Sequence, residues 1–595
     1  MDPLELLRAH EPVLKINKVD LFLPTSVGAY VDLCSLWEIT PDGDHVELVP
    51  AGGLDLDELS RLGRAYAGRT VYLRFVQTPL SRWQYWKWRR DGHHARMPHA
   101  SRFAHVGLST RVVDGLFRLS LLFRKRVPKG TVSAAEILYR EHMRDAGYPY
   151  YGRVVHEAGW TVCQYWFFYA INDWRSSYNG INDHEADWET INVYLAPDAD
   201  GVLTPRWVAL SSHDGEGDAL RRRVDDPALE WQDGHVVAYT GAGSHSHSVR
   251  AVDELIRIDA PVFQRSFHWA RRIISLITPW ADSSGVQEGL GIPFVDYHRG
   301  DGKVIGPGGT DDWTPVVISD DTPWVSDFRG RWGLDSGDRF GGESAPTGPR
   351  YERDGIDRTR WDDPLGWAGL QKVAPDQGVA SDVLVPRLAD LDAEIAQLDA
   401  RMDAMRTVAR SEMVHAQAME IDSITQSLAT ERYVDARRIE ADILGDAATR
   451  RRLAAERASL ARAIEEGIPP TGPRDHLRAR DHIPGQEEVV KSTPILRAWA
   501  AVSTSVLLAI LIWLLVANDS QHYWLGVVVG IVVLVGVESM ARGRVLQFLV
   551  SIVALAAFIA LLVGFMHEWR ITLAVVFGVI ALYLLVQNVR ELLNR

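Results

Sequence analysis

The most apolar part of this 595-residue chain lies at its C-terminal end. Four apolar runs follow one another there, separated by short polar segments: 498–517, 523–537, 545–566 and 571–589. About 20 apolar residues cross the hydrocarbon core of a bilayer as a helix, and the first, third and fourth runs come close to that length. The second run needs residues 538–541, or local thinning of the bilayer, to cross. We therefore predict four transmembrane helices within residues 495–595.

The charged residues that flank these runs predict their orientation. Basic residues lie before the first run, between the second and third, and after the fourth: Lys491, Arg497, Arg542, Arg544, Arg590 and Arg595. Because cytoplasmic loops are enriched in Lys and Arg, both termini are expected in the cytoplasm. The N-terminal segment lacks a signal-peptide core, so the soluble part is expected there too. The alternative is a helical bundle buried in a soluble protein, but four such runs in succession are rare in soluble folds.

A heptad pattern precedes the apolar runs. Apolar residues recur at alternating spacings of four and three, as along the seam of a coiled coil: Leu384, Leu388, Leu391, Ile395, Leu398, Met402 and Met405. Two or three long helices, including an antiparallel hairpin, fit residues 381–466. This region serves either as a spacer with a charged, solvated face or as an element for homo-oligomer formation. Prolines then interrupt the helical pattern and predict a linker over residues 467–494.

The first 375 residues show a third pattern. Short runs of β-branched and aromatic residues alternate with clusters of Gly, Pro, Asp and Asn, which is typical of a mainly β architecture. The expected strands cover 160–170, 189–196, 206–212 and 235–240, and the expected helices cover 56–66, 134–146 and 252–258. We expect residues 1–375 to form one decorated β-sandwich domain, followed by the coiled coil and the transmembrane helices.

Composition and charge exclude several classes of protein. The net charge of −14 argues against nucleic acid as a partner, since phosphate binding needs a basic surface. Only two cysteines occur, Cys34 and Cys163, which excludes a disulfide scaffold and fits a reducing compartment. The sequence contains no G-x-S-x-G, Walker A or HExxH motif, and no Rossmann fingerprint in its usual context. Acyl transfer, nucleotide hydrolysis and hydride transfer therefore have no support from motifs.

The clearest candidate chemistry lies in residues 184–189 (HEADWE). In a strand, Asp187 and Glu189 share one face, which then continues with apolar residues from Ile191 onward. Neighbouring buried carboxylates repel each other, and a divalent cation would remove both the repulsion and the cost of burial. His184, in the preceding loop, would supply a third ligand. Spacing alone leaves open the alternative that the two carboxylates pair with arginine or cap a turn.

Two more histidine-bearing segments follow expected strands, and their loops could meet at the rim of the sandwich. His213 comes directly after one strand, and His245 lies in residues 241–247 (GAGSHSH) after another. Glu185 or His213 would act as a general base on a metal-bound water in a metal-dependent hydrolase, and His245 would stabilise developing charge. The same three residues are candidate contacts for a bound ligand.

Several segments together resemble the vacuolar-sorting-protein-62-like family, whose core is similar to the necrosis- and ethylene-inducing-peptide (NLP) cytolysin fold. These segments are EPVLKINKVDLFLPTSV, QYWFFYAIND, HEADWETINVYL, LSSH, YTGAGSHSHS, GRWG and GESAPTGP. The resemblance covers most of residues 11–350. It implies a central β-sandwich whose rim holds a divalent cation, calcium or magnesium by the family pattern. A histidine among carboxylates also suits manganese or zinc.

The NLP heptapeptide Gly-His-Arg-His-Asp-Trp-Glu places the residues of its metal site on His184, Asp187 and Glu189. An upstream aspartate of the family corresponds to Asp173. The chain departs from the heptapeptide at three positions: Asp183, Glu185 and Ala186. The resemblance therefore implies the fold and the cation site rather than the cytolytic activity.

These observations lead to three functional hypotheses. The first is a membrane-anchored, cytoplasmic-facing module in which a divalent cation binds a polar, headgroup-like ligand or a partner. The second is a metal-dependent hydrolase that uses the same site. The third is a structural or trafficking scaffold in which the cation only holds loops together.

Overall fold

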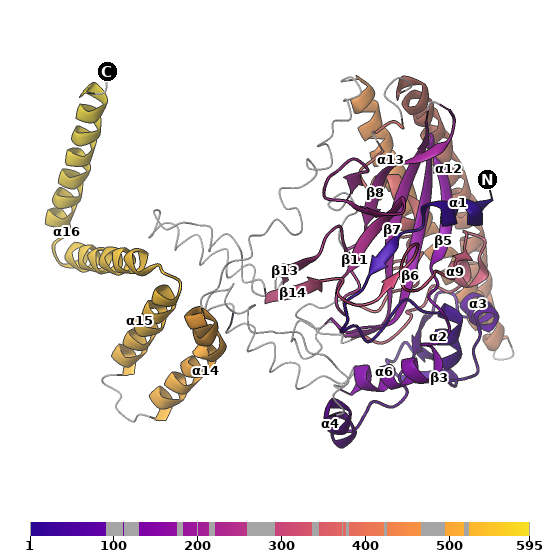
Figure 1. Ribbon diagram of the computed structural model, residues 1–595, viewed down its shortest axis with the longest axis horizontal. Coiled ribbons are helices and arrows are strands. Elements are labelled where there is room, and N and C mark those ends of the chain that lie inside the picture. Colours follow the sequence, from indigo (N-terminus) through magenta and orange to yellow (C-terminus); the bar gives the residue numbers. More distant parts are fainter. Residues whose placement is uncertain are drawn as a thin grey trace. The chain divides into compact units, whose positions relative to one another are not determined.

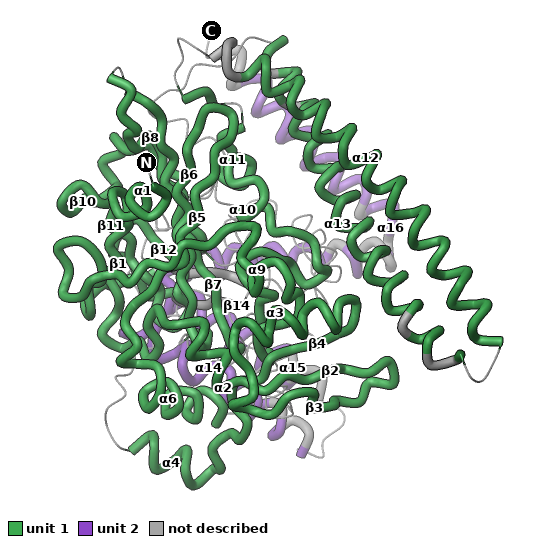
Figure 2. Tube along the Cα trace, turned by 90° about the vertical axis from the view of Figure 1, so that its right-hand side faces the viewer, with its two compact units in different colours: residues 1–99, 120–256, 295–489 green, residues 100–119, 257–294, 490–595 purple. Residues whose placement is uncertain are grey.

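The computed structural model describes most of the chain but not all of it. The described residues are 2–90, 111, 130–174, 183–198, 200–212, 221–258, 292–335, 344–371, 373–375, 380–421, 425–465, 494–516 and 523–593. The chain forms two compact units: residues 1–99, 120–256 and 295–489, and residues 100–119, 257–294 and 490–595 (Figure 2). The expected division was a simple succession of 1–375, 381–466, 467–494 and 495–595. The expected linker lies outside the described residues, except for Pro494.

A six-stranded sheet forms the centre of the first unit (Figure 1). Its order is β16 (Val316–Val317), β5 (Tyr151–Glu157), β6 (Trp160–Asn172), β7 (His184–Pro197), β8 (Leu203–Leu210) and β9 (Arg222–Arg223). The pairs from β5 to β9 are antiparallel. All 13 residues of β6 are buried, because both faces of this strand are covered. Its continuous apolar and aromatic sequence is typical of such a strand.

A second sheet packs on one face of the six-stranded sheet. It contains β10 (Glu230–Gln232), β11 (His235–Thr240), β1 (Val13–Lys15) and β15 (Val304–Ile305), with β12 (His247–Ser248) paired to β11. Side chains of both sheets form one apolar cluster, which includes Phe167 and Ile191 from the first sheet and Leu14 and Ala238 from the second. The two sheets therefore pack face to face, as the alternating pattern predicts.

The other face of the six-stranded sheet is covered by a three-stranded sheet and by helices. The sheet has the order β3 (His45–Val49), β2 (Ser35–Ile39), β4 (Thr70–Arg74). Five helices contribute to the same apolar cluster: α2 (Val27–Leu33), α3 (Leu56–Ala65), α6 (Thr131–His142), α9 (Pro323–Asp327) and α10 (Thr359–Asp362). The remaining short helices are α1 (Pro3–His10), α4 (Arg82–Arg90) and α11 (Pro364–Trp367). Trp166, Trp188 and Trp332 are buried in this second core.

Most expected elements of the first unit are present, and one is wrong. The expected strands correspond to β6, β7, β8 and β11, and two expected helices correspond to α3 and α6. Residues 252–258, expected as a helix, form strand β13 (Val252–Ile258), which pairs with β14 (Ile292–His298). The β-branched residues Val252, Ile256 and Ile258 favour a strand, and the pairing partner comes from a distant part of the sequence.

Two long helices follow the β-rich part. Helices α12 (Ala380–Met419) and α13 (Gln426–Glu465) contain 40 residues each. Leu384 and Leu391 of α12 cluster with Leu453 and Leu460 of α13, so the helices run antiparallel. Ion pairs support this register: Arg450–Asp399 at 2.6 Å and Arg457–Asp392 at 2.6 Å. The apolar seam thus packs within one chain, as a hairpin, which is one of the expected arrangements.

The C-terminal region contains three helices: α14 (Pro494–Val516), α15 (Tyr523–Ala541) and α16 (Val545–Leu593). The segment 567–570, expected as a loop, is helical, because it contains neither proline nor glycine to interrupt α16. One described segment, Trp569–Val589, is long and apolar enough to cross a membrane. Three others are apolar but shorter: Pro494–Ile510, Val528–Ala541 and Val545–Ala560. The four expected spans are thus not all present as separate helices.

An ion pair lies inside this second unit. Arg111 donates to both carboxylate oxygens of Glu538, each at 2.9 Å, and to Ser503 Oγ at 2.9 Å. Glu538 also accepts from Trp499 Nε1 and Arg542 Nε, each at 2.6 Å. Arg111 is fully enclosed at its side chain, so α14 and α15 are held to a residue from a distant part of the sequence.

Candidate functional site

Strands β6 and β7 position the expected site residues. Asp187 lies opposite Tyr169, and Glu189 lies opposite Phe167. Both carboxylates are buried. They share the strand face of Ile191, which belongs to the apolar cluster between the two sheets. Asp187 and Glu189 also influence the Tyr169 hydroxyl electrostatically, so they lie together at one end of this cluster. The prediction of two carboxylates at the start of an apolar face is therefore confirmed.

A backbone irregularity separates Glu185 from these carboxylates. Ala186 has φ of 59°, in the left-handed region, which interrupts the alternation of side chains along β7. The Glu185 carboxylate accepts hydrogen bonds from the backbone amides of Phe75 at 3.1 Å, Val76 at 2.8 Å and Leu334 at 3.0 Å. Burial raises the pKa of Glu185, and the three amides oppose that rise. The expectation that Glu185 acts as a base or ligand contact is not supported, because both of its oxygens are engaged in holding the backbone.

His245 forms the closest contact with the expected metal site. Its Nδ1–H donates to Asp187 Oδ2 at 2.9 Å, and the side-chain amide of Asn172 donates to the same oxygen at 3.2 Å. The imidazole stacks on the Tyr169 ring, with 3.8 Å between ring centroids and 3° between planes. His245 is 1% exposed, and its Nε2 has no hydrogen-bond partner among the described residues. The Tyr169 hydroxyl is likewise without a described hydrogen-bond partner.

Glu189 is held by the neighbouring strand β8. Ser211, just beyond β8, donates its hydroxyl to Glu189 Oε2 and accepts the backbone amide of Thr190 at 2.8 Å. The Ser211 carbonyl in turn accepts the amide of His247 at 2.9 Å. These bonds bring the 241–247 loop to the end of β7, as the convergence of strand ends predicts. His213 lies outside the described residues.

The other two expected ligands lie close to the same end of the sheet. His184 Nδ1 donates to the Ala186 carbonyl at 2.7 Å, which leaves Nε2 as the nitrogen with a lone pair. The Asp173 amide donates to the Gly243 carbonyl at 2.9 Å. Gly243 has φ of 78°, and a Cβ there would lie 2.6 Å from the Asp173 carbonyl oxygen. Glycine is therefore required where this loop meets Asp173.

A second polar cluster next to the site was missed by the sequence analysis. Asp296 accepts hydroxyl hydrogen bonds from Ser244 at 2.7 Å and from Ser246, and Ser246 Oγ lies 3.0 Å from His298 Nε2. Burial, together with the neighbouring His298 and His245, lowers the pKa of His247 to about 3, so this ring is neutral. The alternation of Ser and His in residues 241–247 was the available signal. The partners of these serines, Asp296 and His298, lie on β14, a strand that the sequence analysis did not predict.

The four expected ligands do not form a compact coordination sphere. We looked among the described residues for three potential metal ligands whose ligand atoms all lie within 4.8 Å of one another. Glu157, Asp363 and Glu456 meet this condition, and the four expected ligands do not. At Asp187, Oδ2 instead accepts hydrogen bonds from His245 and Asn172. The structure thus brings Asp187, Glu189, His245 and His247 into one hydrogen-bonded region without gathering three of the expected ligand atoms at a point.

The acidic group itself is already engaged by arginine side chains. Arg387 of α12 donates to Glu157 at 2.7 Å and to Glu456 at 3.3 Å. Arg452 of α13 lies 3.1 Å from Asp363. Burial raises the pKa of Glu157 to about 8 and that of Glu456 to about 7. This arginine–carboxyl cluster links the helical hairpin to the β-rich part of the same unit, and its two glutamates are partly protonated near neutral pH.

The contact between Asp187 and His245 would allow the imidazole to bind a metal ion or to accept a proton. A carboxylate that accepts Nδ1–H fixes the imidazole tautomer, raises its basicity and presents Nε2 to a metal ion or a proton. No family model matches this chain, and searches of curated proteins and of solved structures likewise give no match.

Proposed function

We propose that this chain is a membrane-associated protein that binds a divalent cation at the end of the six-stranded sheet. The observation that carries the proposal is the Asp187–His245 pair, whose outer nitrogen is buried and unpartnered among the described residues. Native proteins rarely leave a buried polar atom unsatisfied, and a bound ion would satisfy it. The neighbouring Tyr169 hydroxyl supports the same argument.

The residues near His245 suggest how an ion would be held. His245 Nε2 would be a ligand, and Asp187 would orient the ring from behind, as carboxylates do for metal-bound histidines. Glu189, His184 and Asp173 would complete the proposed set. Their ligand atoms do not meet at one point in this structure, so an ion would have to draw them together. Imidazole nitrogens favour zinc or manganese, whereas calcium and magnesium prefer oxygen ligands. The participation of His245 therefore moves the proposal from calcium or magnesium toward zinc or manganese.

The C-terminal helices support membrane association. Large apolar side chains are exposed along Trp569–Val589, including Phe577 at 64% and Leu582 at 62%. Exposed apolar surface of this extent requires a nonpolar environment or a partner. We propose that this segment crosses the bilayer. The basic flanks continue to favour cytoplasmic termini and a cytoplasmic β-rich unit.

The burial of the site favours a structural role for the ion. Asp187, Glu189 and His245 are all buried, which favours a cation that holds strands and loops together, as in the scaffold hypothesis. A headgroup-like ligand would need the 241–247 loop to open. The Asp187–His245 pair also resembles a general-base arrangement, which keeps a hydrolase as the second candidate.

Metal analysis of the full-length protein in detergent tests this proposal. We expect the wild type to retain close to one equivalent of a divalent metal by mass spectrometry, and His245→Ala to retain almost none. His415→Ala, an exposed histidine on α12, serves as the matched control and should retain the wild-type content. A wild type without metal, or a folded His245→Ala variant with full metal content, contradicts the proposal. Phosphoester or glycoside hydrolysis that Asp187→Asn abolishes would place the hydrolase first.

A further inference from the structure

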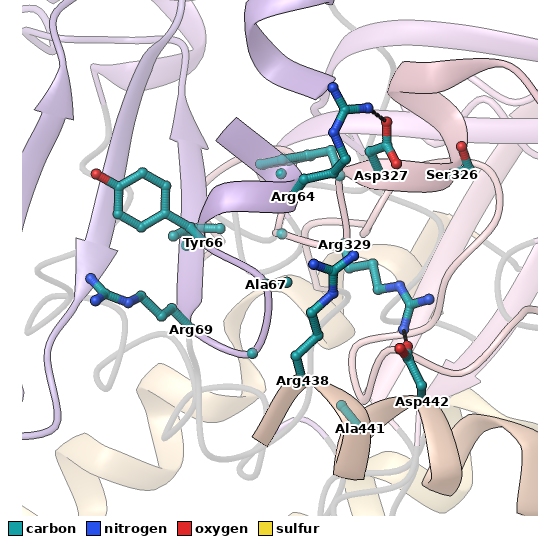
Figure 3. A pocket seen from close by; sticks show the side chains of 15 residues that line it. Arg64, Tyr66, Ala67, Arg69, Ser326, Asp327, Arg329, Arg438, Ala441 and Asp442 are labelled. Carbon is teal, nitrogen blue, oxygen red and sulfur yellow. Dashed lines mark hydrogen bonds and ion pairs between the residues drawn. The ribbon is translucent and has the colours of Figure 1, made fainter. Parts of the chain in front are cut away.

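We propose that a cavity between the β-rich part and helix α13 binds a phosphate-type anion. The cavity has a volume of about 150 Å³ and lies within the first unit (Figure 3). Its walls come from three segments that are distant in sequence: residues 63–71, 326–330 and 438–442. A space of this size holds several water molecules and therefore a phosphate group.

The lining of the cavity is rich in arginine. It contains four guanidinium groups, from Arg64, Arg69, Arg329 and Arg438, against the two carboxylates of Asp327 and Asp442. The lining is thus positive although the chain as a whole carries a net charge of −14. A local excess of positive charge in an acidic protein attracts anions to that place.

Two of the four arginines are paired inside the cavity. Arg64 lies 2.5 Å from Asp327, and Arg329 lies 2.9 Å from Asp442. In Figure 3 the Arg438 side chain extends from α13 toward the 326–330 segment, beside Arg329. These pairs hold Arg64 and Arg329 in place, as the walls of a preformed site require.

The other two arginines have donors to spare. Arg69 lies 3.3 Å from Glu38, which is outside the cavity lining. Among the described residues, Arg438 makes no hydrogen bond or ion pair. A guanidinium presents its donors as a planar fork that matches two oxygens of a phosphate, which favours this anion over a halide. The Tyr66 ring, under Arg69 at 5.3 Å, restricts that guanidinium further.

The backbone packs closely around the cavity. A Cβ on Gly63 would lie 2.6 Å from the Asp327 carbonyl oxygen, and a Cβ on Gly68 would lie 3.6 Å from the Arg438 amide nitrogen. The β-rich part and α13 therefore meet at this point with little space between their backbones. An anion bound to Arg69 and Arg438 together would fasten the helical hairpin to the β-rich part.

The shared chemistry is a phosphate monoester, either on a soluble molecule or on a lipid headgroup. Calorimetry of the full-length protein with inorganic phosphate and with inositol hexakisphosphate probes the soluble source. Calorimetry of the same protein in detergent with a water-soluble, short-chain phosphatidylinositol 4-phosphate probes the lipid source. Binding in either arm that depends on Arg438 supports the site, and the arm that responds identifies the source.

Arg438→Ala is the decisive variant, since Arg438 has no described ion pair whose loss would destabilise the fold. We expect its affinity for the responding probe to fall at least tenfold. Arg437→Ala, the exposed neighbour on α13 that does not line the cavity, should stay within twofold of the wild type. The proposal is overturned by no binding in either arm, by unchanged affinity in Arg438→Ala, or by an equal loss in Arg437→Ala. None of these outcomes depends on the divalent metal content.

Discussion

The Nδ1 atom of His245 lies 2.9 Å from Oδ2 of Asp187, and this contact joins residues 58 positions apart in the sequence. It converts a surface-loop histidine into a buried, oriented imidazole at the end of β7. Asp187 was expected to bind a cation directly. The geometry gives it a different role in the same site, as the acceptor that fixes the ring of His245.

Replacement of Asp187 by asparagine tests this orientation. The asparagine keeps the shape of the side chain, but it cannot provide a charged acceptor for Nδ1–H. We expect metal affinity to fall roughly 10- to 100-fold, the usual effect of removing a partner of a metal-bound histidine. Titration with a competing chelator measures the change. An Asp187→Asn protein with wild-type affinity would show that the carboxylate has no part in metal binding.

In contrast to Asp187, Glu185 is expected to affect the stability of the fold and not the binding of metal. Glu185→Gln places an amide group opposite backbone donors that need an acceptor, so a buried N–H loses its partner. We expect a loss of roughly 2–4 kcal/mol in the free energy of unfolding. The metal content per folded molecule should remain that of the wild type. Chemical denaturation and metal analysis of the same sample separate the two effects, and loss of metal from the folded fraction would return Glu185 to the site.

The requirement for glycine at position 243 has a matched control in the same domain. Gly243 and Gly234 both have positive φ, of 78° and 86°, but a Cβ meets the Asp173 carbonyl only at Gly243 and meets nothing within 4 Å at Gly234. Both alanine variants share the backbone strain. We expect Gly243→Ala to be less stable than Gly234→Ala by roughly 1–3 kcal/mol because of the additional overlap. Equal melting temperatures for the two variants would show that the loop moves aside freely.

The arginine–carboxyl cluster between the hairpin and the β-rich part predicts a pH dependence of stability. Burial raises the pKa of Glu456 to about 7 and that of Glu157 to about 8, above the ordinary value of 4.5. The folded protein therefore holds protons that the unfolded chain releases. The resulting stabilisation is complete below about pH 4.5 and is lost as the pH rises through 7 and 8.

Glu456→Gln removes one of these titrations. We expect the variant to be more stable than the wild type at pH 8.5, by roughly 1–3 kcal/mol, and to lose less stability between pH 5 and pH 8.5. Glu440→Gln, at an exposed position on the same helix, should follow the wild-type profile. Thermal unfolding in a series of buffers provides the comparison. Parallel profiles for all three proteins would mean that Glu456 titrates normally in the folded state.

The ion pair of the second unit predicts an effect on the C-terminal helices. Arg111→Ala leaves the Glu538 carboxylate without its bidentate partner, and removing one member of a buried pair costs roughly 3–5 kcal/mol. The double variant Arg111→Ala with Glu538→Gln should recover part of that loss. Protease sensitivity of α14 and α15 in detergent reports the change. A single variant as resistant as the wild type would contradict a structural role for this pair.

The sequence predicted best what depends on local pattern. The aromatic run of β6 and the alternation in β7 and β11 are properties of each segment alone, and these strands are present. The heptads from Leu384 predicted long helices with an apolar seam, and the observed hairpin, whose seam lies between α12 and α13, is one of the arrangements that fitted them. The face shared by Asp187 and Glu189 follows from the period of a strand, and it too is confirmed.

What the sequence could not supply depends on distant partners or on single backbone angles. Strand β13 was taken for a helix because its partner β14 is remote in the chain. Glu185 was a candidate general base and ligand contact, and the positive φ of Ala186, an unusual conformation for alanine that has no sequence signal, separates it from Asp187. Asp296 and His298 lie on β14, and the sequence did not predict that this strand would lie beside the polar region. The helix through residues 567–570 shows that polar residues alone do not end a helix.

The interleaving of the two units has a practical consequence. The chain passes between them five times, at residues 99, 119, 256, 294 and 489. Cutting the chain before α14 would therefore leave Arg111 without its partners Ser503 and Glu538 on α14 and α15. We expect such truncations to aggregate, and grafting these helices onto another protein would transfer an incomplete assembly. The C-terminal helices are thus part of a unit assembled from several stretches of the chain, and they are not a separable tail.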